Sequence, residues 1–387
     1  MNVTVRTEPE PGERRVAATP DSVRHLTGVG LTVTVEKGAG SAAGYFDAEY
    51  VEAGATLAAT VDLAKAEVLL HVRPLSSVDV KKLPKTAITV GLASPASNLA
   101  VVDELRKRGV TSFALELVPR ISRAQSMDAL TSQALVSGYR CVLEAAIRLP
   151  RFFPLYMTAA GTVPPASVVV LGAGVAGLQA IATAKRLGAK VSAYDVREAS
   201  ADEVRSMGGT FITLDLETAD GAGGYATELA ADRAKRQQEL LAPYLAQADV
   251  IITTAAIPGR PAPLLVTRDM LTGMQPGSVI VDLAAESGGN VEGSKPGADV
   301  EITLVAGGSV TLVGMKDAAS TMAYDASRLY ARNVSNLIAL MTVDGRVVPD
   351  FTDEVVSGAC LTHDGTISHA PTLAAIEAEA GPTKVSK

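Results

Sequence analysis

The sequence predicts an α/β protein whose two domains are each built on a parallel β-sheet. Its length of 387 residues suits about two domains, and a composition that is 47% apolar is enough for sizeable cores. Short apolar runs alternate with helical segments along most of the chain, which is typical of parallel sheets covered by helices. One stretch, residues 162–197, contains a strand, a glycine-rich turn, a helix and a second strand in succession.

The stretch at residues 162–197 has the pattern of a complete βαβ unit. Residues 168–171 form an uninterrupted apolar run, as expected for a strand that is buried on both faces of a sheet. From Val175 the apolar residues recur at helical spacing, and Gly188 ends the helix. Residues 190–195 then indicate a second strand, which we expect to lie parallel to the first.

Between the first strand and the helix lies the sequence GAGVAG, whose three glycines have separate physical roles. Gly172 permits a tight turn, Gly174 lets backbone N–H groups approach a ligand, and Gly177 lets the helix pack closely on its strand. The first turn of the helix, with Val175 and Ala176, carries partial positive charge and free N–H donors, which favour an anion. We therefore predict that this turn binds the pyrophosphate of a dinucleotide.

An acidic residue stands where such a site binds the ribose of the dinucleotide. Asp195 ends the second strand, 23 positions after Gly172, and its carboxylate can accept hydrogen bonds from the adenosine ribose hydroxyls. It also repels a 2′-phosphate, so we expect NAD(H) to be preferred over NADP(H). Val196 and Arg197 complete this predicted contact, although the Arg197 cation could also meet a 2′-phosphate. This domain is therefore expected to be Rossmann-like.

Composition narrows the class of protein. The net charge is −7 and no basic stripe occurs, which argues against nucleic acid as a partner. Cys141 and Cys360 lie far apart without metal-ligand spacing, so we expect no metal site and a reducing compartment. Acidic residues near the N-terminus argue against an export signal, and prolines and glycines interrupt the charge-free run at 152–184, which argues against a membrane span. We expect a soluble, cytoplasmic protein.

The N-terminal part predicts a first α/β domain. Thr19-Pro20 is a helix start with proline at the first position, and residues 98–108 indicate a helix. Strands are expected at 3–5, 31–35, 68–72, 88–92 and 111–115. Because this part has no glycine fingerprint, we expect it to contribute side-chain contacts rather than to bind a nucleotide itself.

A polar loop at 117–132 leads into a helix that we expect at 138–149. The loop offers a cation, an amide, a carboxylate and two hydroxyls, on Arg120, Gln125, Asp128, Thr131 and Ser132. Such groups at a domain boundary suit the carboxamide and ribose of a nicotinamide, since cofactor sites often lie in interdomain clefts. A helix N-cap with solvated charges explains the same residues equally well.

The second half of the chain predicts the rest of the second sheet. Strands are expected at 210–214, 249–254, 278–282 and 310–313. Two of them are followed by turns that would lie at the carboxyl ends of parallel strands, where ligands of such sheets bind. These turns supply the remaining candidates for cofactor binding, which are Thr254, Ala255, Ala256, Pro258, Leu283, Ala284 and Glu286.

Two further segments complete the domain plan. The glycine-rich segment 219–225, which ends in Tyr225, is compatible with a loop that closes over a cofactor and equally with a surface connection. A last helix at 325–341 is expected to return to the first domain, and the tail beyond Gly381 is expected to be disordered. We therefore assign 1–132 and 318–387 to the first domain and 133–317 to the second, with an NAD site in the cleft between them.

Several motifs together resemble one known family. They are RISRAQSMDALTSQ, MTAAGTVPPASVVVLGAGVAGLQAIATAKRLGA, AGGYA, TTAAIPGRPAP, PGSVIVDLAAESGGNVEG and VSGACLTHDGTISHAP. Over nearly the whole chain they resemble the NAD(H)-binding component, the first portion of the alpha subunit, of proton-translocating NAD(P) transhydrogenases, in the alanine dehydrogenase/transhydrogenase family. The resemblance implies direct hydride transfer between NADH on this component and NADP⁺ on a separate one, coupled to proton translocation by membrane-spanning subunits. It also implies a homodimer that is peripheral to the inner face of the plasma membrane through these partners.

The resemblance also implies roles by position. The residues that match the loop orienting the NAD(H) nicotinamide are Arg120, Gln125, Asp128 and Thr131, of which the first three are the candidate catalytic residues. Gln125 also matches a residue that positions the NADP(H) ring, and Tyr225 matches the aromatic of a mobile loop. Hydride transfer between two nicotinamides needs no general base, so catalysis reduces to holding two rings in register. Two departures are Thr131, where the family commonly has Ser, and the segment 314–321, which lacks the expected pattern.

Two other functions fit parts of the sequence. An alanine dehydrogenase-like enzyme shares this domain plan and needs a cation for the substrate carboxylate, which Arg15 could supply. Its other groups are matched poorly, because His71 stands at best for its lysine and Glu286 for its catalytic aspartate. The third possibility is a non-catalytic NAD-binding regulatory subunit, against which Gln125 and Asp128 argue.

Overall fold

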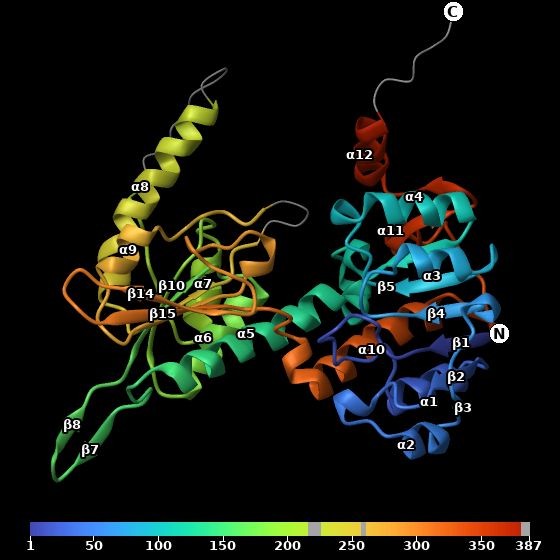
Figure 1. Ribbon diagram of the computed structural model, residues 1–387, viewed down its shortest axis with the longest axis horizontal. Coiled ribbons are helices and arrows are strands. Elements are labelled where there is room, and N and C mark those ends of the chain that lie inside the picture. The colour runs from blue at the N-terminus through green and yellow to red at the C-terminus, as the bar shows by residue number, and fades with distance from the viewer. Residues whose placement is uncertain (216–225, 257–260, 381–387) are drawn as a thin grey trace, which may run out of the picture. The chain divides into compact units, whose positions relative to one another are not determined.

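The computed structural model describes residues 1–215, 226–256 and 261–380. It contains two compact units, which are residues 1–133 with 319–387 (unit 1) and residues 134–318 (unit 2). Each unit is built on its own, mostly parallel sheet with helices packed against it (Figure 1). The predicted α/β fold class with two Rossmann-like domains is therefore confirmed.

The sheet of unit 1 combines parallel strands with an antiparallel edge. Its strands are β1 (Asn2–Val5), β2 (Thr32–Glu36), β3 (Thr56–Ala58), β4 (Val68–Leu70), β5 (Ile88–Gly91), β6 (Thr111–Ala114), β18 (Cys360–His363) and β19 (Thr366–Ile367). Their order in the sheet is β19-β18-β6-β5-β4-β1-β2-β3. The strands from β6 to β3 in this order are parallel, whereas β18 pairs antiparallel with both β6 and β19.

The helices of unit 1 begin and end where local sequence signals place them. They are α1 (Pro20–Gly28), α2 (Asp47–Glu52), α3 (Ser77–Lys82), α4 (Leu99–Arg108), α10 (Ala323–Leu340), α11 (Glu354–Ala359) and α12 (Ala370–Ala380), and α5 (Ala129–Arg148) contains the unit boundary. Thr19 is the N-cap of α1, as predicted. Gly109 ends α4 with φ +75°, which favours glycine. The apolar face of α10 packs into the core of unit 1 through Val334, Leu337 and Ile338.

The sheet of unit 2 has the doubly wound order that the glycine motif predicts. Its strands are β9 (Ser167–Leu171), β10 (Lys190–Tyr194), β11 (Thr210–Phe211), β12 (Val250–Thr253), β13 (Val279–Asp282), β14 (Asp299–Thr303) and β15 (Ser309–Gly314), with helices α6 (Val175–Arg186), α7 (Ser200–Ser206), α8 (Ala226–Ala246) and α9 (Arg268–Thr272). The strand order is β11-β10-β9-β12-β13-β15-β14, and β14 is antiparallel to β15. The chain direction across the sheet reverses between β9 and β12, and ligands of such sheets bind at the carboxyl ends of the strands there.

Some expected boundaries were wrong. The segment 117–132 is not a plain loop, because a 3-10 helix, η5 (Ser122–Met127), leads directly into α5, which begins at Ala129 instead of residue 138. The strand expected at 210–214 stops at Phe211, since β11 pairs with β10 at only two positions. The helix α10 is also not the last, because α11 and α12 follow it. Short edge elements of this kind have weak periodicity and depend on their neighbours in the sheet.

A hairpin within the charge-free run projects from unit 2 (Figure 1). Its strands are β7 (Tyr156–Thr158) and β8 (Gly161–Val163), and all of their residues are exposed. A second hairpin, β16 (Thr342–Val343) and β17 (Arg346–Val347), follows α10 in unit 1. Among the described residues, none of the helices combines the length and the apolarity that a membrane span requires.

Candidate functional site

The glycine turn of unit 2 joins β9 to α6 and has the geometry that the sequence predicts. Gly172 has φ +99°, which residues with side chains rarely adopt. A Cβ on Gly177 would lie 1.9 Å from the carbonyl oxygen of Gly172, so only glycine lets α6 pack this closely on the turn. A Cβ on Gly174, the N-cap of α6, would meet no heavy atom of the described residues within 4 Å. The predicted structural roles of Gly172 and Gly177 are confirmed, and the first turn of α6 faces open space.

Asp195 follows β10 and its carboxylate is hydrogen-bonded within unit 2. Its Oδ2 accepts a hydrogen bond from the N–H of Ala173 at 2.7 Å, and its Oδ1 accepts one from the N–H of Arg197 at 2.9 Å. The Arg197 guanidinium donates to both oxygens as well, at 3.0 and 3.1 Å. Burial acts to raise the pKa of Asp195, but these hydrogen bonds outweigh it and lower the pKa. The carboxylate is therefore held ionised beside the glycine turn.

Two fully buried polar side chains, Asp282 and Asn290, shape the turns after β12 and β13. Asp282 accepts hydrogen bonds from the Thr253 hydroxyl at 2.9 Å and from the N–H of Ala284 at 3.0 Å. It also accepts the N–H of Asn290 at 3.1 Å. The Asn290 side chain accepts the N–H of Ala255 at 3.0 Å and donates to the carbonyl oxygen of Ala255 at 2.9 Å. Because buried polar groups are costly to leave unpaired, this network fixes the backbone of both turns.

Thr254 connects these turns to the glycine turn. Its hydroxyl donates to the carbonyl oxygen of Gly172 at 3.1 Å. Most of the predicted cofactor-binding residues thus follow neighbouring strands at the carboxyl edge of one sheet, and these are Gly172, Gly174, Val175, Ala176, Gly177, Asp195, Val196, Arg197, Thr254, Ala255, Ala256, Leu283 and Ala284. Glu286 is exposed and accepts the N–H of Asp317 at 2.9 Å. Tyr225 and Pro258 lie outside the described residues.

The other candidates lie in unit 1, on η5 and around it. Arg120, just before η5, and Gln125 within it are exposed. Asp128 caps α5, because its carboxylate accepts the N–H of Thr131 at 2.9 Å and the hydroxyl of Thr131 at 2.6 Å. Ser132 donates its hydroxyl to an asparagine of α10. The capping role that the sequence allows for this loop is therefore present, and the binding role stays a prediction.

Unit 1 also contains a buried charged cluster whose pairing the sequence does not predict. Glu13 accepts two hydrogen bonds from the Arg15 guanidinium, at 2.8 and 2.7 Å, and one from Nε of Arg73 at 2.7 Å. Burial acts to raise the pKa of Glu13, but these cations lower it to about 2. Arg15 is 6% exposed and also donates to the side-chain oxygen of Gln133 at 2.8 Å. No local signal in the sequence could have joined residues this far apart.

Two buried titratable groups after β1 and β4 have shifted pKa values. Burial lowers the pKa of His71 to about 4, and its Nδ1 faces the carbonyl oxygen of Arg73 at 2.7 Å. Burial raises the pKa of Glu8 to about 7, and its carboxylate accepts the N–H groups of Val72 and Arg73 at 2.7 and 3.1 Å. The folded state therefore favours the neutral form of each side chain.

These shifts predict opposite changes in the pH dependence of stability. As pH falls from about 6.5 to about 4, the unfolded chain binds a proton at His71 and the folded chain does not, so this group's contribution decreases by up to about 3 kcal/mol. As pH rises from about 4.5 to about 7, folded Glu8 keeps its proton while the unfolded chain loses it, so the contribution of Glu8 decreases. Urea unfolding should show that His71→Gln reduces the gain in stability between about pH 5 and pH 7, whereas Glu8→Gln increases it. An unchanged gain in both variants would contradict the shifts.

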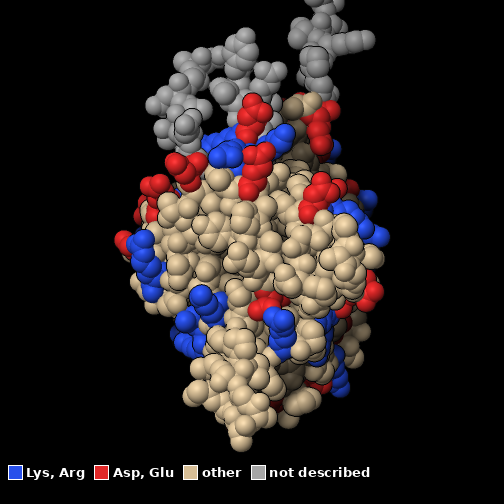
Figure 2. All heavy atoms as spheres, turned by 90° about the vertical axis from the view of Figure 1, so that its left-hand side faces the viewer, with Lys and Arg blue, Asp and Glu red and all other residues tan. Residues whose placement is uncertain are grey.

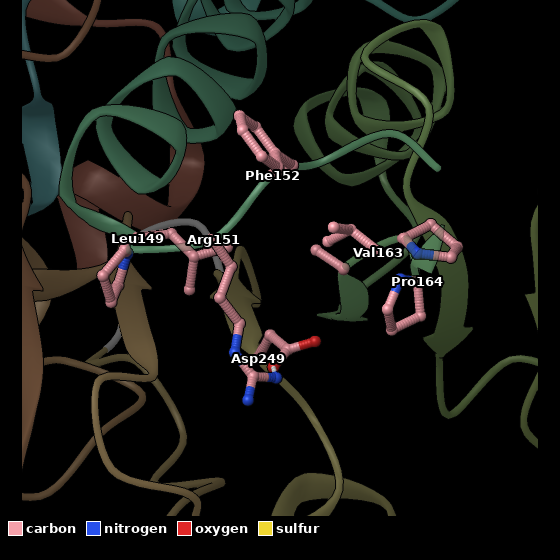
Figure 3. A pocket seen from close by; sticks show the side chains of 9 residues that line it. Leu149, Arg151, Phe152, Val163, Pro164 and Asp249 are labelled. Atoms are coloured by element: carbon pink, nitrogen blue, oxygen red, sulfur yellow. Dashed lines mark hydrogen bonds and ion pairs between the residues drawn. The ribbon is translucent and has the colours of Figure 1, made fainter. Parts of the chain in front are cut away.

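A pocket of unit 2 lies away from the glycine turn. It has a volume of about 580 Å³ and is lined by Leu149, Pro150, Arg151, Phe152, Val163, Pro164, Pro165, Ala166 and Asp249 (Figure 3). Arg151 and Asp249 form an ion pair in it. Ala166 and Asp249 directly precede β9 and β12, so the pocket lies at the amino ends of these strands, opposite the edge where dinucleotides bind. Within the described residues, no three His, Cys, Asp or Glu side chains are grouped to hold a metal ion.

Two family models together match almost the whole chain. One is described as alanine dehydrogenase/PNT, N-terminal domain, and matches residues 4–137, and the other is the C-terminal domain of the same family and matches residues 141–370. The chain belongs to the alanine dehydrogenase/PNT family. Its family resemblance, predicted from the RISRAQSMD and GAGVAG motifs, is thereby confirmed.

Relatives within the alanine dehydrogenase/PNT family fall on both branches of its name. The first portion of NAD(P) transhydrogenase subunit alpha of Rhodospirillum rubrum, a separate chain, is 47% identical over 381 residues, which cover 95% of this chain and 98% of the relative. An alanine dehydrogenase of Mycobacterium tuberculosis is 33% identical over 301 residues, which cover 76% of each chain. The crystal structure of a transhydrogenase from Sinorhizobium meliloti has a TM-score of 0.83 at 42% identity and covers 96% of this chain and 100% of that chain. Identity and coverage are both higher on the transhydrogenase branch.

Proposed function

We propose that this chain is the NAD(H)-binding component of a proton-translocating NAD(P) transhydrogenase. It transfers hydride directly between NADH and NADP⁺ bound on a partner subunit, and membrane-spanning subunits couple the transfer to proton translocation. The observation that carries this proposal is the 47% identity, over 95% of the chain, to the first portion of an NAD(P) transhydrogenase alpha subunit. The glycine turn and the ionised Asp195 beside it support the nucleotide-binding role.

The carboxyl edge of the unit 2 sheet fits a dinucleotide. The first turn of α6 offers N–H donors, and the space beside Gly174 leaves room for a pyrophosphate. Asp195 accepts the ribose hydroxyls in exchange for hydrogen bonds that it now receives from Arg197. We assign to the same site the other residues predicted from the sequence, which are Val175, Ala176, Val196, Tyr225, Thr254, Ala255, Ala256, Pro258, Leu283, Ala284 and Glu286.

The chain's own part in catalysis is to orient a nicotinamide. NADH supplies the hydride from C4 of its dihydronicotinamide ring, and neither reacting carbon gains or loses a proton. The exposed side chains of Arg120 and Gln125 bind the carboxamide and ribose side of the ring. Asp128, which is held in place by its bonds to Thr131, gives the loop a fixed negative group next to them. Positioning of this kind accounts for catalysis without a general base.

Direct transfer is tested with NADH that carries deuterium at the reacting position of C4. In the presence of the NADP(H)-binding partner and NADP⁺, the deuterium should appear in NADPH and not in the solvent, as measured by mass spectrometry. NADPH that forms without deuterium would contradict direct transfer, because the hydrogen would then have passed through water.

Asp195 is expected to decide the choice of nucleotide. Asp195→Asn keeps the shape of the side chain but removes its negative charge and weakens its hold on Arg197. We expect NADH affinity to fall about tenfold, equivalent to about 1.4 kcal/mol, and NADPH affinity to rise. The chain has no tryptophan, so the fluorescence of both nucleotides can be titrated without interference from indole emission.

Asp202→Asn is the matched control, because it removes the same charge from an exposed aspartate on α7 that is paired with Arg205. It should leave both affinities unchanged. If Asp195→Asn behaved like this control, Asp195 would not contact the ribose.

We infer that the active protein is a homodimer and that the β7–β8 hairpin of each copy contacts the other. The hairpin and the segment before it expose apolar side chains, with Met157 at 76%, Phe152 at 57% and Tyr156 at 47%. The face of the molecule in Figure 2 has a broad area without Lys, Arg, Asp or Glu side chains. Exposed apolar area of this kind favours association. The NADP(H)-binding and membrane-spanning subunits are the other proposed partners, and they hold the chain at the cytoplasmic face of the plasma membrane.

The alternative of an alanine dehydrogenase requires a cation that is free for a substrate carboxylate. Arg15 is buried and already bound to Glu13 and Gln133. The Glu286 carboxylate, which would stand for the catalytic aspartate, accepts the N–H of Asp317. These pairings weigh against amino-acid oxidation, and they say nothing against a non-catalytic NAD-binding subunit, which the deuterium experiment would reveal by the absence of transfer.

A further inference from the structure

The peptide that follows Gln125 is held by two side-chain amides from α10. The carbonyl oxygen of Ser126 accepts a hydrogen bond from Nδ2 of Asn333 at 2.9 Å and another from Nδ2 of Asn336 at 3.0 Å. Ala124 and Met127, on either side, are buried in the core of unit 1. The backbone of η5 is therefore fixed around Gln125, while the Gln125 side chain itself is exposed.

Asn333 has its own orientation fixed by a chain of hydrogen bonds. Its Oδ1 accepts the Ser132 hydroxyl at 2.7 Å, and the side chain is 7% exposed. Ser132 in turn accepts a hydrogen bond from Nε2 of Gln133 at 3.2 Å. Gln133 donates to the carbonyl oxygen of Ala326 at 3.1 Å as well, which ties it to α10. Each amide therefore has its oxygen and nitrogen assigned by its partners, so neither can flip without losing a bond.

The chain of hydrogen bonds ends on the buried charged cluster. The side-chain oxygen of Gln133 accepts Nη1 of Arg15 at 2.8 Å. Arg15 is held by two hydrogen bonds to Glu13, which also accepts one from Arg73. A guanidinium that is clamped by a buried carboxylate cannot move without breaking charge-assisted hydrogen bonds, so it is a rigid anchor. In this chain the buried arginine supports a loop backbone instead of awaiting a ligand.

We propose that Arg15, Gln133, Ser132 and Asn333 form a positioning relay that sets the orientation of Gln125 for hydride transfer. This inference rests on the proposed function, because Gln125 is assigned to the nicotinamide there. The relay acts through the Ser126 carbonyl, the peptide group directly after Gln125. Since misplacement of a reacting group by about 1 Å can cost a hundredfold in rate, the relay should affect the rate of transfer more than the binding of NADH.

The test replaces the donor at the end of the relay. Asn333→Asp keeps the size of the side chain and can still accept the Ser132 hydroxyl, but it places an oxygen against the Ser126 carbonyl. We expect hydride transfer to the NADP(H)-binding partner to slow about tenfold or more, with NADH affinity within about twofold of wild type. Asn336→Asp, on a half-buried residue, should have a smaller effect in the same direction and covers the case in which Asn333→Asp fails to fold.

Ser335→Ala is the matched control. Ser335 is fully buried in the same helix and is hydrogen-bonded to His25 and to the carbonyl oxygen of Arg332, not to η5. It should lower the melting temperature without changing the rate of transfer. If Ser335→Ala slowed transfer as much as Asn333→Asp did, the effect would come from general destabilisation of α10, and the relay would be wrong.

Hydrogen exchange separates failure of the relay from failure of the proposed function. Asn333→Asp should raise amide exchange in residues 122–128 whether or not the protein transfers hydride, whereas Ser335→Ala should not. Unchanged exchange and an unchanged rate in both Asn333→Asp and Asn336→Asp would overturn the relay. Faster exchange together with a wild-type rate would also overturn it, because the loop would then move without effect on catalysis. A wild-type protein that transfers no hydride would instead refute the proposed function.

Discussion

Gly177→Ala is expected to lower both the stability of unit 2 and its affinity for NADH. The new Cβ would lie 1.9 Å from the carbonyl oxygen of Gly172 and 3.0 Å from the hydroxyl of Thr254, so α6 would have to move away from the turn. Overpacking of this kind costs about 1–3 kcal/mol of the free energy of unfolding. Displacement of the helix also takes N–H donors away from the proposed pyrophosphate, and we expect NADH affinity to fall at least about tenfold.

Gly174→Ala is the matched substitution, because it separates packing from binding. Its Cβ would meet no heavy atom of the described residues within 4 Å, and its φ of −75° suits alanine. The free energy of unfolding should therefore change by less than about 0.5 kcal/mol. NADH affinity should still fall, since the Cβ enters the space assigned to the pyrophosphate. Thermal unfolding and NADH fluorescence titration measure the two effects, and wild-type affinity in Gly174→Ala would place the pyrophosphate elsewhere.

Gln125→Asn is expected to slow hydride transfer by about 10- to 100-fold while NADH affinity stays within about twofold. The shorter side chain keeps the amide but withdraws it by one methylene, so the nicotinamide is held less well against its partner ring. Most of the binding free energy of NADH comes from the unit 2 edge, which the substitution does not touch. Single-turnover transfer rates and NADH titrations on the same preparations give both quantities.

Ser122→Ala, on an exposed residue of the same 3-10 helix, is the control for Gln125→Asn. It should leave the rate and the affinity unchanged. Equal losses of rate and affinity in Gln125→Asn would show that Gln125 supports the structure of the loop rather than the orientation of the nicotinamide.

The features that could be predicted from the sequence are those that depend on neighbouring residues. The GAGVAG turn requires glycine for reasons that act within six positions, and the structure has the predicted φ at Gly172 and the predicted close packing at Gly177. The start of α1 at Thr19-Pro20 is local in the same sense. Asp195 is predictable in a similar way, because a fixed spacing separates it from the turn.

The features that escape prediction join residues far apart in the chain. Asn290 shapes the turn at Ala255 and Asn333 holds the carbonyl of Ser126, and neither asparagine is marked by any local pattern. The sequence leaves the role of Arg15 open between a ligand cation and a structural group, since only tertiary packing brings Gln133 to it. The early start of α5 escapes prediction because a capping aspartate and a ligand-binding aspartate look alike in the sequence, and Asp128 fits both.

The measurement that tests the central claim most directly is hydride transfer from NADH to a spectrally distinct NADP⁺ analogue, followed by absorbance with and without the NADP(H)-binding partner. The proposed function predicts transfer only when both proteins are present, because this chain supplies one of the two nicotinamide sites. If the partner added nothing while pyruvate and ammonia consumed NADH with this chain alone, the transhydrogenase assignment would be wrong and an amino-acid dehydrogenase would take its place.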